Sequence, residues 1–185
     1  MKALKHFNKI LTHKYYVFKN CCRYGLIWRG IKHDLSKFSP IEFFESIKYY
    51  TGTDSPINKC KKENGYSLAW QHHKGRNTHH YEYWMDNFDQ GGTSIIMPYK
   101  DALEMFCDYI AAAQAYMGKD FTWGAEYNWW KKKSENCAMN FHTKKFISHC
   151  MQWGKSYEEF PPKSMVEYYY QVSLTDKEFK VLKDY

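Results

Sequence analysis

A histidine followed directly by an aspartate, His33-Asp34, is the feature of this sequence with the clearest chemical potential. An imidazole nitrogen and a carboxylate oxygen are both common ligands of divalent metal ions. Lys37 lies four residues after His33, so on a helix both side chains would share one face. A cation there can hold a phosphate oxygen close to a metal ion. The dipeptide alone is weak evidence, because it arises by chance in many proteins.

Further histidines and acids on both sides of this pair strengthen the metal hypothesis. His13 lies upstream, and downstream come four histidines within nine residues and then two acids on an expected helix (His72, His73, His79, His80, Glu104 and Asp108). Adjacent residues of a helix point about 100° apart, so the four clustered histidines cannot all be ligands. We expect His73 and His79 to be ligands, then His80, and His72 least of all.

The order His…His-Asp…His…His…Asp resembles the HD-domain superfamily of metal-dependent phosphohydrolases. The segment His33-Asp-Leu-Ser-Lys37 is similar to the His-Asp-x-x-Lys signature of its HD-GYP branch. More closely, the chain resembles a family of bacterial and phage proteins that carry a domain of unknown function. The matching segments are 33–43, 62–84 and 97–108, and the resemblance covers roughly residues 5–150. It implies a helical fold and a metal site but names no substrate.

The resemblance implies one set of four ligands for a first ion: His13, His33, Asp34 and Asp108. His73 and His79, with His80 as a further candidate, would complete a second ion, and Asp34 would bridge the two. Glu104 lies one turn before Asp108 and is expected to orient a histidine ligand. Imidazoles and carboxylates without thiolates suit Mn, Fe, Co, Ni or Zn and do not choose among them.

The expected reaction is hydrolysis of a nucleotide or other small phosphoester by a metal-activated water. Asp34 would hold the metal, and Lys37, with Arg76 as a weaker candidate, would stabilise the developing negative charge. No Gly-rich phosphate loop and no side-chain nucleophile motif is present. Two alternatives stay open: a di-iron enzyme of the HD type that activates dioxygen, and a non-catalytic helical protein that binds a structural metal, a ligand or a partner.

Composition limits the class of protein. The 185 residues fit one HD-like helical domain over 1–155 and a C-terminal extension over 156–185, which is a candidate interaction or homo-oligomer element. The lysines behind the net charge of +7 are spread along the chain, so we do not expect nucleic-acid binding. The mean hydropathy of −0.74 predicts no membrane span. Six cysteines without a Cys-x-x-Cys pair indicate reduced thiols in the cytoplasm of a bacterial cell or phage-infected host.

The apolar periodicity predicts an all-α bundle of about six to eight helices. The expected helices are 2–23, 26–37, 40–50, 56–64, 66–74, one after Thr78, 98–117 and two within 122–153, with a short last helix after a capping box at 175–178. In the first, an apolar stripe should face the core (Leu4, Phe7, Leu11, Tyr15, Phe18 and Cys22). Ser39 and Glu42 read as a capping box, which assigns Glu42 a structural role. The loop 85–97 is either a lid or a connection.

Overall fold

The computed structural model describes residues 2–175, and the all-α prediction is confirmed there: nine α-helices and no strand are present. Eight of them begin within residues 1–155, and the ninth lies in the extension. The helices are α1 Lys2–Cys22, α2 Ile27–Lys32, α3 Pro40–Tyr49, α4 Pro56–Asn64, α5 Leu68–Lys74, α6 Tyr99–Met117, α7 Trp123–Glu135, α8 Phe141–Tyr157 and α9 Lys163–Thr175. Short 3₁₀ helices follow Asp34 (η1, Leu35–Phe38) and His80 (η2, Tyr81–Trp84).

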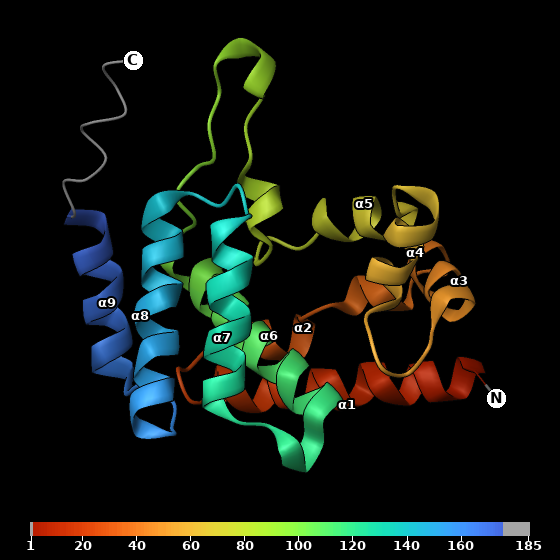
Figure 1. Cartoon of the computed structure of the whole chain (residues 1–185), viewed down its shortest axis with the longest axis horizontal. Helices are drawn as coiled ribbons and strands as arrows, with labels where there is room; N and C mark the ends of the chain where they lie inside the picture. The colour runs from red at the N-terminus through yellow and green to blue at the C-terminus, as the bar shows by residue number, and fades with distance from the viewer. Residues whose placement is uncertain (1, 176–185) are drawn as a thin grey trace.

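The helices form two groups around the long α1 (Figure 1). Helices α3, α4 and α5 gather at one end of α1, and α7, α8 and α9 stand side by side towards the other end. Helix α6 lies in the middle and packs along α1. The site described below lies where α1, the turn after α2, the end of α5 and α6 meet.

Helix α6 is the centre of the hydrophobic core. Leu103, Met105, Phe106 and Ile110 have no exposed surface, and Ala102, Cys107 and Ala111 are fully buried beside them. A helix that is apolar on nearly every side is stable only when other elements surround it. Trp130 of α7 and buried residues of α8 and α9 close the core (Phe146, Ile147 and Val166).

The stripe predicted for the first helix faces the wrong way. Leu4 and Tyr15 are 66% and 60% exposed, and Leu11 and Phe18 are also exposed. The buried face of α1 instead carries His6, Ile10, His13, Val17, Asn20 and Cys21. Asn20 donates hydrogen bonds to the Cys107 carbonyl and to Gln114 on α6. Polar residues occupy the inner face because they meet polar partners there, which periodicity alone does not reveal.

Two other expected helices are wrong in extent. The second ends at Lys32 rather than at residue 37, because His33 is extended and Asp34 is left-handed with φ 55°. The residues directly after Thr78 do not form the expected α-helix. They lead into the 3₁₀ helix η2, and the Thr78 hydroxyl donates a hydrogen bond to Asp101 instead of capping a helix. Ser39 precedes α3 as expected, but its hydroxyl makes no capping hydrogen bond.

The loop 85–97 connects η2 to α6. Residues 85–97 project away from the helices (Figure 1), with one β-bridge between Met85 and Ser94, so they form a connection here rather than a lid.

The division of the chain into 1–155 and 156–185 stays a prediction. Helix α8 runs across residue 155, and Val166 of α9 is fully buried against the core. The helix expected after residue 175 lies outside the described residues. No helix within 2–175 is long and apolar enough to cross a membrane.

Candidate metal centre

The turn that ends α2 directs the side chains of His33 and Asp34 towards the same point. Adjacent residues of a continuous helix would point about 100° apart. Here His33 has φ −49° and ψ 127°, and Asp34 has φ 55° and ψ 27°. A non-glycine residue at positive φ is uncommon, and aspartate tolerates it better than most. His33 Nε2 lies 3.3 Å from Asp34 Oδ2, so the break in the helix makes the two side chains neighbours.

A first group of potential ligands joins three helical regions. His13 from α1, His33 and Asp34 from the turn after α2, and Asp108 from α6 each offer one atom, and these four atoms lie within 4.8 Å of one another. His13 Nε2 is 3.0 Å from Asp108 Oδ1, and His33 Nε2 is 3.4 Å from the same oxygen. This is the set that the sequence predicts for the first ion.

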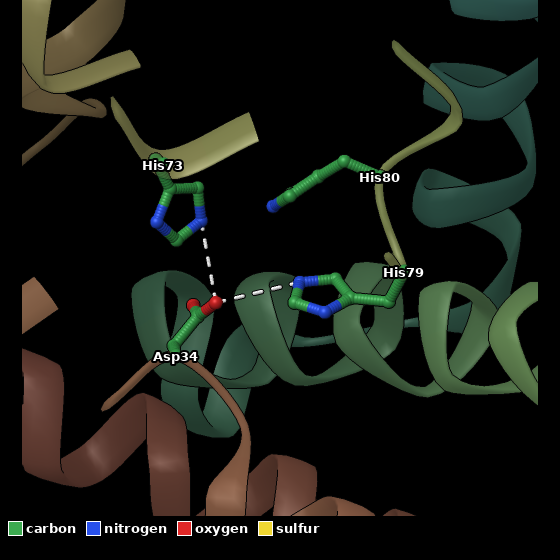
Figure 2. Close-up of side chains that lie close together, drawn as sticks. All are labelled: Asp34, His73, His79 and His80. Atoms are coloured by element: carbon green, nitrogen blue, oxygen red, sulfur yellow. Dashed lines mark ion pairs between the residues drawn. The ribbon is translucent and has the colours of Figure 1, made fainter. Parts of the chain in front are cut away.

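A second group meets the first at Asp34. His73 from α5 and His79 and His80 from the segment after it converge on this aspartate (Figure 2). Asp34 Oδ1 is 3.2 Å from His73 Nε2 and 3.4 Å from His79 Nε2, whereas Oδ2 faces His33. The two carboxylate oxygens therefore face the two groups, which is the arrangement expected of a carboxylate shared between two ions.

Several polar atoms of these side chains are buried without a well-oriented hydrogen bond. Nε2 of His13, His33, His79 and His80 and both oxygens of Asp34 make none among the described residues. Asp34 instead forms ion pairs with Lys37 at 2.5 Å and His73 at 3.2 Å, and His13 Nε2 lies 3.0 Å from Asp108. Native structures contain few buried polar atoms without a hydrogen bond. Nitrogen lone pairs and carboxylate oxygens facing one another fit ligands arranged around a cation. A third group shares residues with the other two and consists of His33, His79 and Glu104. It also offers three potential ligand atoms within 4.8 Å of one another.

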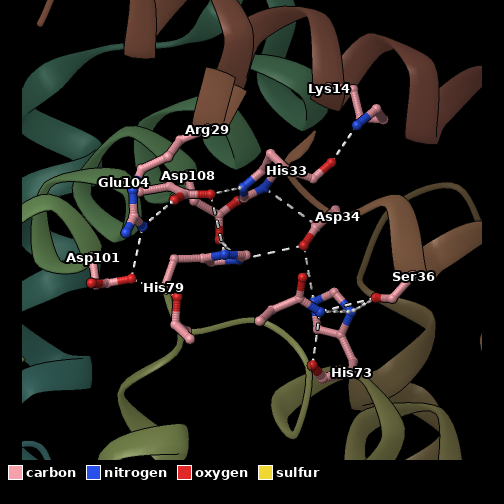
Figure 3. Close-up of polar contacts among 12 residues, drawn as sticks. Lys14, Arg29, His33, Asp34, Ser36, His73, His79, Asp101, Glu104 and Asp108 are labelled. Carbon is pink, nitrogen blue, oxygen red and sulfur yellow. Dashed lines mark hydrogen bonds and ion pairs between the residues drawn. The ribbon is translucent and has the colours of Figure 1, made fainter. Parts of the chain in front are cut away.

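Two buried glutamates orient the histidines. Glu104 Oε1 accepts a hydrogen bond from His33 Nδ1 at 2.9 Å, and Glu42 Oε2 accepts one from His73 Nδ1 at 2.8 Å. Because a carboxylate only accepts, each Nδ1 carries a proton, and in the neutral form of each imidazole the Nε2 lone pair is directed at the site. Arg29 in turn donates to Glu104 at 2.9 Å and to Asp101 at 2.7 Å (Figure 3).

Neighbouring charges and burial shift the pKa values of the buried side chains in this cluster. Burial raises the pKa of a carboxyl group, but His33 and Lys37 outweigh burial and hold the pKa of Asp34 well below its usual range. Burial also disfavours charged His33, yet Asp34 and hydrogen bonds to Asp108 and Glu104 raise its pKa well above the usual value. Burial and the neighbouring histidines lower the pKa of His80, which therefore stays neutral and able to bind a metal.

The structure brings together all seven side chains predicted as metal ligands, and His72 is outside both groups. His72 donates from Nδ1 to Glu42 at 2.6 Å and points to the same glutamate as His73. His149 of α8 lies outside both groups as well and stacks on Tyr169 of α9. Sequence reasoning missed Glu42 and Arg29: the residues around Glu42 fit a helix start equally well, and Arg29 is an ordinary surface residue by pattern.

The two predicted cationic residues lie on different sides of the cluster. Lys37 Nζ is 2.5 Å from Asp34 Oδ2 and lines a cavity together with His13 and Asp108. Arg76 is exposed and lines a second cavity with His33 and His79. The cluster thus forms the wall between two cavities, and a single phosphoryl group bound in one of them would meet only one of these two cations at close range.

Taken together, the fold and the site define an all-α protein with a buried cluster of histidines and carboxylates shared among four helical regions. Residues 2–152 match the model of a family of unknown function, DUF5662, and the chain belongs to this family. No curated protein and no solved structure gives a significant match to the chain.

Proposed function

We propose that this protein is a metal-dependent phosphohydrolase that acts on a nucleotide or another small phosphoester. The observation that carries the proposal is Asp34, whose two oxygens face two separate groups of potential ligands. The order of these residues along the chain, which resembles the HD-domain superfamily, supports the same reaction. The histidine and carboxylate donors suit one or two ions of Mn, Fe, Co, Ni or Zn.

The residues of the chain divide into ligands and a charge partner. His13, His33, Asp34 and Asp108 would hold one ion, and His73, His79 and His80 with the other oxygen of Asp34 would hold a second. When bound, a divalent ion lowers the pKa of a coordinated water and neutralises negative charge on phosphoryl oxygens. Two divalent ions would bring a charge of about +4, and Asp34 and Asp108 would reduce it to about +2 when the histidine ligands are neutral, so the loaded site would stay positive enough to attract a phosphate dianion.

Hydrolysis would join the oxygen of water to phosphorus and break the bond from phosphorus to the leaving oxygen. One proton of the water ends on the alcohol that leaves. Lys37 lines the cavity beside the ligands, and burial disfavours its ammonium, but Asp34 and Asp108 raise its pKa so that it stays charged. A charged Lys37 can donate a hydrogen bond to a phosphoryl oxygen as negative charge develops there. Arg76 faces the other cavity and is the weaker candidate.

Metal analysis combined with a hydrolysis screen tests this proposal. The purified protein, loaded with each metal in turn, is expected to bind one or two ions and to hydrolyse at least one phosphomonoester. The Asp34→Asn variant should keep its helical circular dichroism and lose turnover by at least a hundredfold. Asp54→Asn is the matched control, because Asp54 is an exposed aspartate whose side chain is 49% accessible.

Other outcomes would reject the proposal. A protein that binds metal, loses thermal stability on chelation and hydrolyses no phosphoester is a non-catalytic metal protein. A protein that binds iron and consumes oxygen is a di-iron enzyme of the alternative type. A protein that binds no metal at all contradicts both the ligand assignment and the reaction.

A further inference from the structure

The cavity that contains Lys37 extends from the metal cluster into apolar surroundings. It measures about 210 Å³, and His13, His73, His80 and Asp108 form its wall at the cluster. The rest of the wall is largely apolar or aromatic and comes from α1, α4, α5 and α6 (Ile10, Pro56, Ile57, Trp70, Ala112 and Tyr116). Ligand sites are typically apolar pockets with a few fixed polar groups, which describes this cavity. An engineered apolar cavity of about 150 Å³ holds benzene, so this one has room for an aromatic ring.

His6 is a buried polar residue of this cavity that the proposed reaction does not use. It lies on the same face of α1 as Ile10 and His13, seven residues before His13 and therefore about 10 Å from it along the helix axis. His6 is only 6% exposed, and its Nδ1 is buried without a hydrogen-bond partner among the described residues. Its ring packs against Phe43 and Tyr50, with centroids 5.7 and 5.1 Å away, which fixes its orientation.

His6 lacks the carboxylate partner that most histidines of the cluster have. His13, His33, His73 and His79 form ion pairs with Asp34, Glu42, Glu104 or Asp108, whereas His6 and His80 form none with a carboxylate in the described part of the chain. Burial and the charge of Lys37 lower the pKa of His6 to about 4, so its imidazole is neutral at pH 7. A neutral imidazole donates from one nitrogen and accepts at the other.

The charged groups of the cavity already have partners. Glu42 accepts hydrogen bonds from His72 and His73, and Lys37 pairs with Asp34. Lys9 donates to the Ala115 carbonyl at 2.8 Å and lies over the Tyr116 ring. The cavity away from the cluster thus offers apolar surface and neutral hydrogen-bonding side chains, including those of His6, Ser46 and Ser55. Of these three, only His6 has a buried polar atom without a hydrogen-bond partner among the described residues. A charged group placed there would lose its hydration without a compensating partner.

We infer that this cavity binds the organic group of the substrate, and that this group is an uncharged planar ring with a polar edge that hydrogen-bonds to His6. The inference rests on the proposed function, because it places the phosphate at the cluster. It adds the class of leaving group: a ring such as a nucleobase or a hydroxylated aryl group, attached through a short linker. His6 would then determine specificity and take no part in the reaction at phosphorus.

Three phosphonates that cannot be hydrolysed test the inference by direct binding to the metal-loaded protein in calorimetry. They are methylphosphonate, benzylphosphonate and 4-hydroxybenzylphosphonate. We expect benzylphosphonate to bind at least tenfold more tightly than methylphosphonate, and the hydroxylated compound to bind roughly three- to tenfold more tightly again, as one hydrogen bond allows. Equal affinities for the three compounds would overturn the inference.

Two variants separate the ring from its hydrogen bond. His6→Phe keeps a planar ring and removes both nitrogens, so it should abolish only the difference between the hydroxylated and plain benzyl compounds. Ala112→Phe fills the cavity from α6, where Ala112 is half-buried, and should abolish the preference for benzyl over methyl. Ala112→Leu is a milder second variant should the first fail to fold. Unchanged preferences in folded variants of both positions would also overturn the inference.

Further measurements distinguish this inference from the proposed function. A protein that holds metal and hydrolyses phosphoesters but shows no ring preference retains the proposed function and loses the ring site. A protein that prefers the benzyl compounds but neither holds metal nor hydrolyses esters retains the ring site and loses the proposed function. The 5′-phosphonate analogues of adenosine and cytidine monophosphates, which also resist hydrolysis, form the last comparison. Tighter binding than 4-hydroxybenzylphosphonate assigns a nucleobase to the cavity, weaker binding assigns an aryl group, and both uphold the site.

Discussion

Glu42 accepts a hydrogen bond from His73 Nδ1 at 2.8 Å, and this contact connects α3 to the metal cluster. The residue pattern around Glu42 predicted only a helix cap. Its other oxygen accepts from His72, so one buried carboxylate sets the position of the whole end of α5. The His73 nitrogen that faces Asp34 is directed by this contact on the opposite side of its ring.

Replacing Glu42 should therefore weaken metal binding without removing a ligand. In Glu42→Gln the neutral amide no longer fixes the His73 tautomer, and we expect a loss of ten- to a hundredfold in metal affinity. Competition with a chromogenic chelator measures this change. Glu63→Gln is the control, because Glu63 is an exposed glutamate on α4 whose ion pair is with Lys59 at 3.6 Å. Equal affinities of the two variants would show that Glu42 does not support the site.

Metal removal should reverse the pH dependence of stability. In the metal-free protein, burial lowers the pKa of His33 and His73, but Asp34 and the nearby hydrogen bonds outweigh it and raise both. A raised pKa contributes stability below the unfolded value of 6.5, and this contribution is lost as the pH rises through the folded pKa. The Tm of chelated protein should therefore fall from pH 6.5 upwards.

The metal-loaded protein is the internal comparison for that measurement. Metal ions compete with protons for the same nitrogens, so metal affinity and the stabilisation it provides should grow with pH. Thermal denaturation from pH 6 to 9, with and without a chelator, should give curves that diverge. Parallel curves would mean that these histidines are not ligands.

Glu126 on α7 should limit stability at neutral and higher pH. It is 6% exposed, and burial raises its pKa to about 7, with Lys133 opposing the shift. Its folded pKa lies above the unfolded value of 4.5, so its contribution to stability is present below pH 4.5 and is lost as the pH rises through 7. Glu126→Gln should then raise the free energy of unfolding at pH 8 by up to about 3 kcal/mol and leave it unchanged at pH 4. Glu135→Gln, at the exposed end of α7, should change neither value in urea denaturation.

The orientation of α1 predicts a small loss of stability for one apolar substitution and a larger loss for another. Leu11 is 44% exposed and Val17 is fully buried. Leu11→Ser should change the free energy of unfolding by less than about 0.5 kcal/mol, because the side chain is already in contact with water. Val17→Ala should cost about 2 kcal/mol through lost burial and a small cavity. Chemical denaturation of both variants measures the difference, and a larger cost for Leu11→Ser would mean that the predicted stripe is buried after all.

Local sequence signals account for most of the helices. Pro40 and Pro56 open α3 and α4 as expected, and Gly65 and Gly118 at positive φ end α4 and α6. These residues act through backbone conformations that depend little on the rest of the chain. The prediction of a helix through His33 was wrong, because contacts with distant parts of the chain determine the backbone conformation there. The helix-forming residues continue past Lys32, but the site holds Asp34 in a left-handed conformation.

The kinds of residue in the cluster could be read from the sequence, because metal-binding side chains are few and their order along the chain is distinctive. Which face of α1 turns inward, and which carboxylates support the histidines, depended on contacts between segments far apart in the chain. Glu104 was expected to orient a histidine because it sits inside an apolar helix, where a carboxylate needs a partner. Glu42 and the unpartnered Nδ1 of His6 carry no such local signal, since their surroundings exist only once α1, α3 and α5 have packed together.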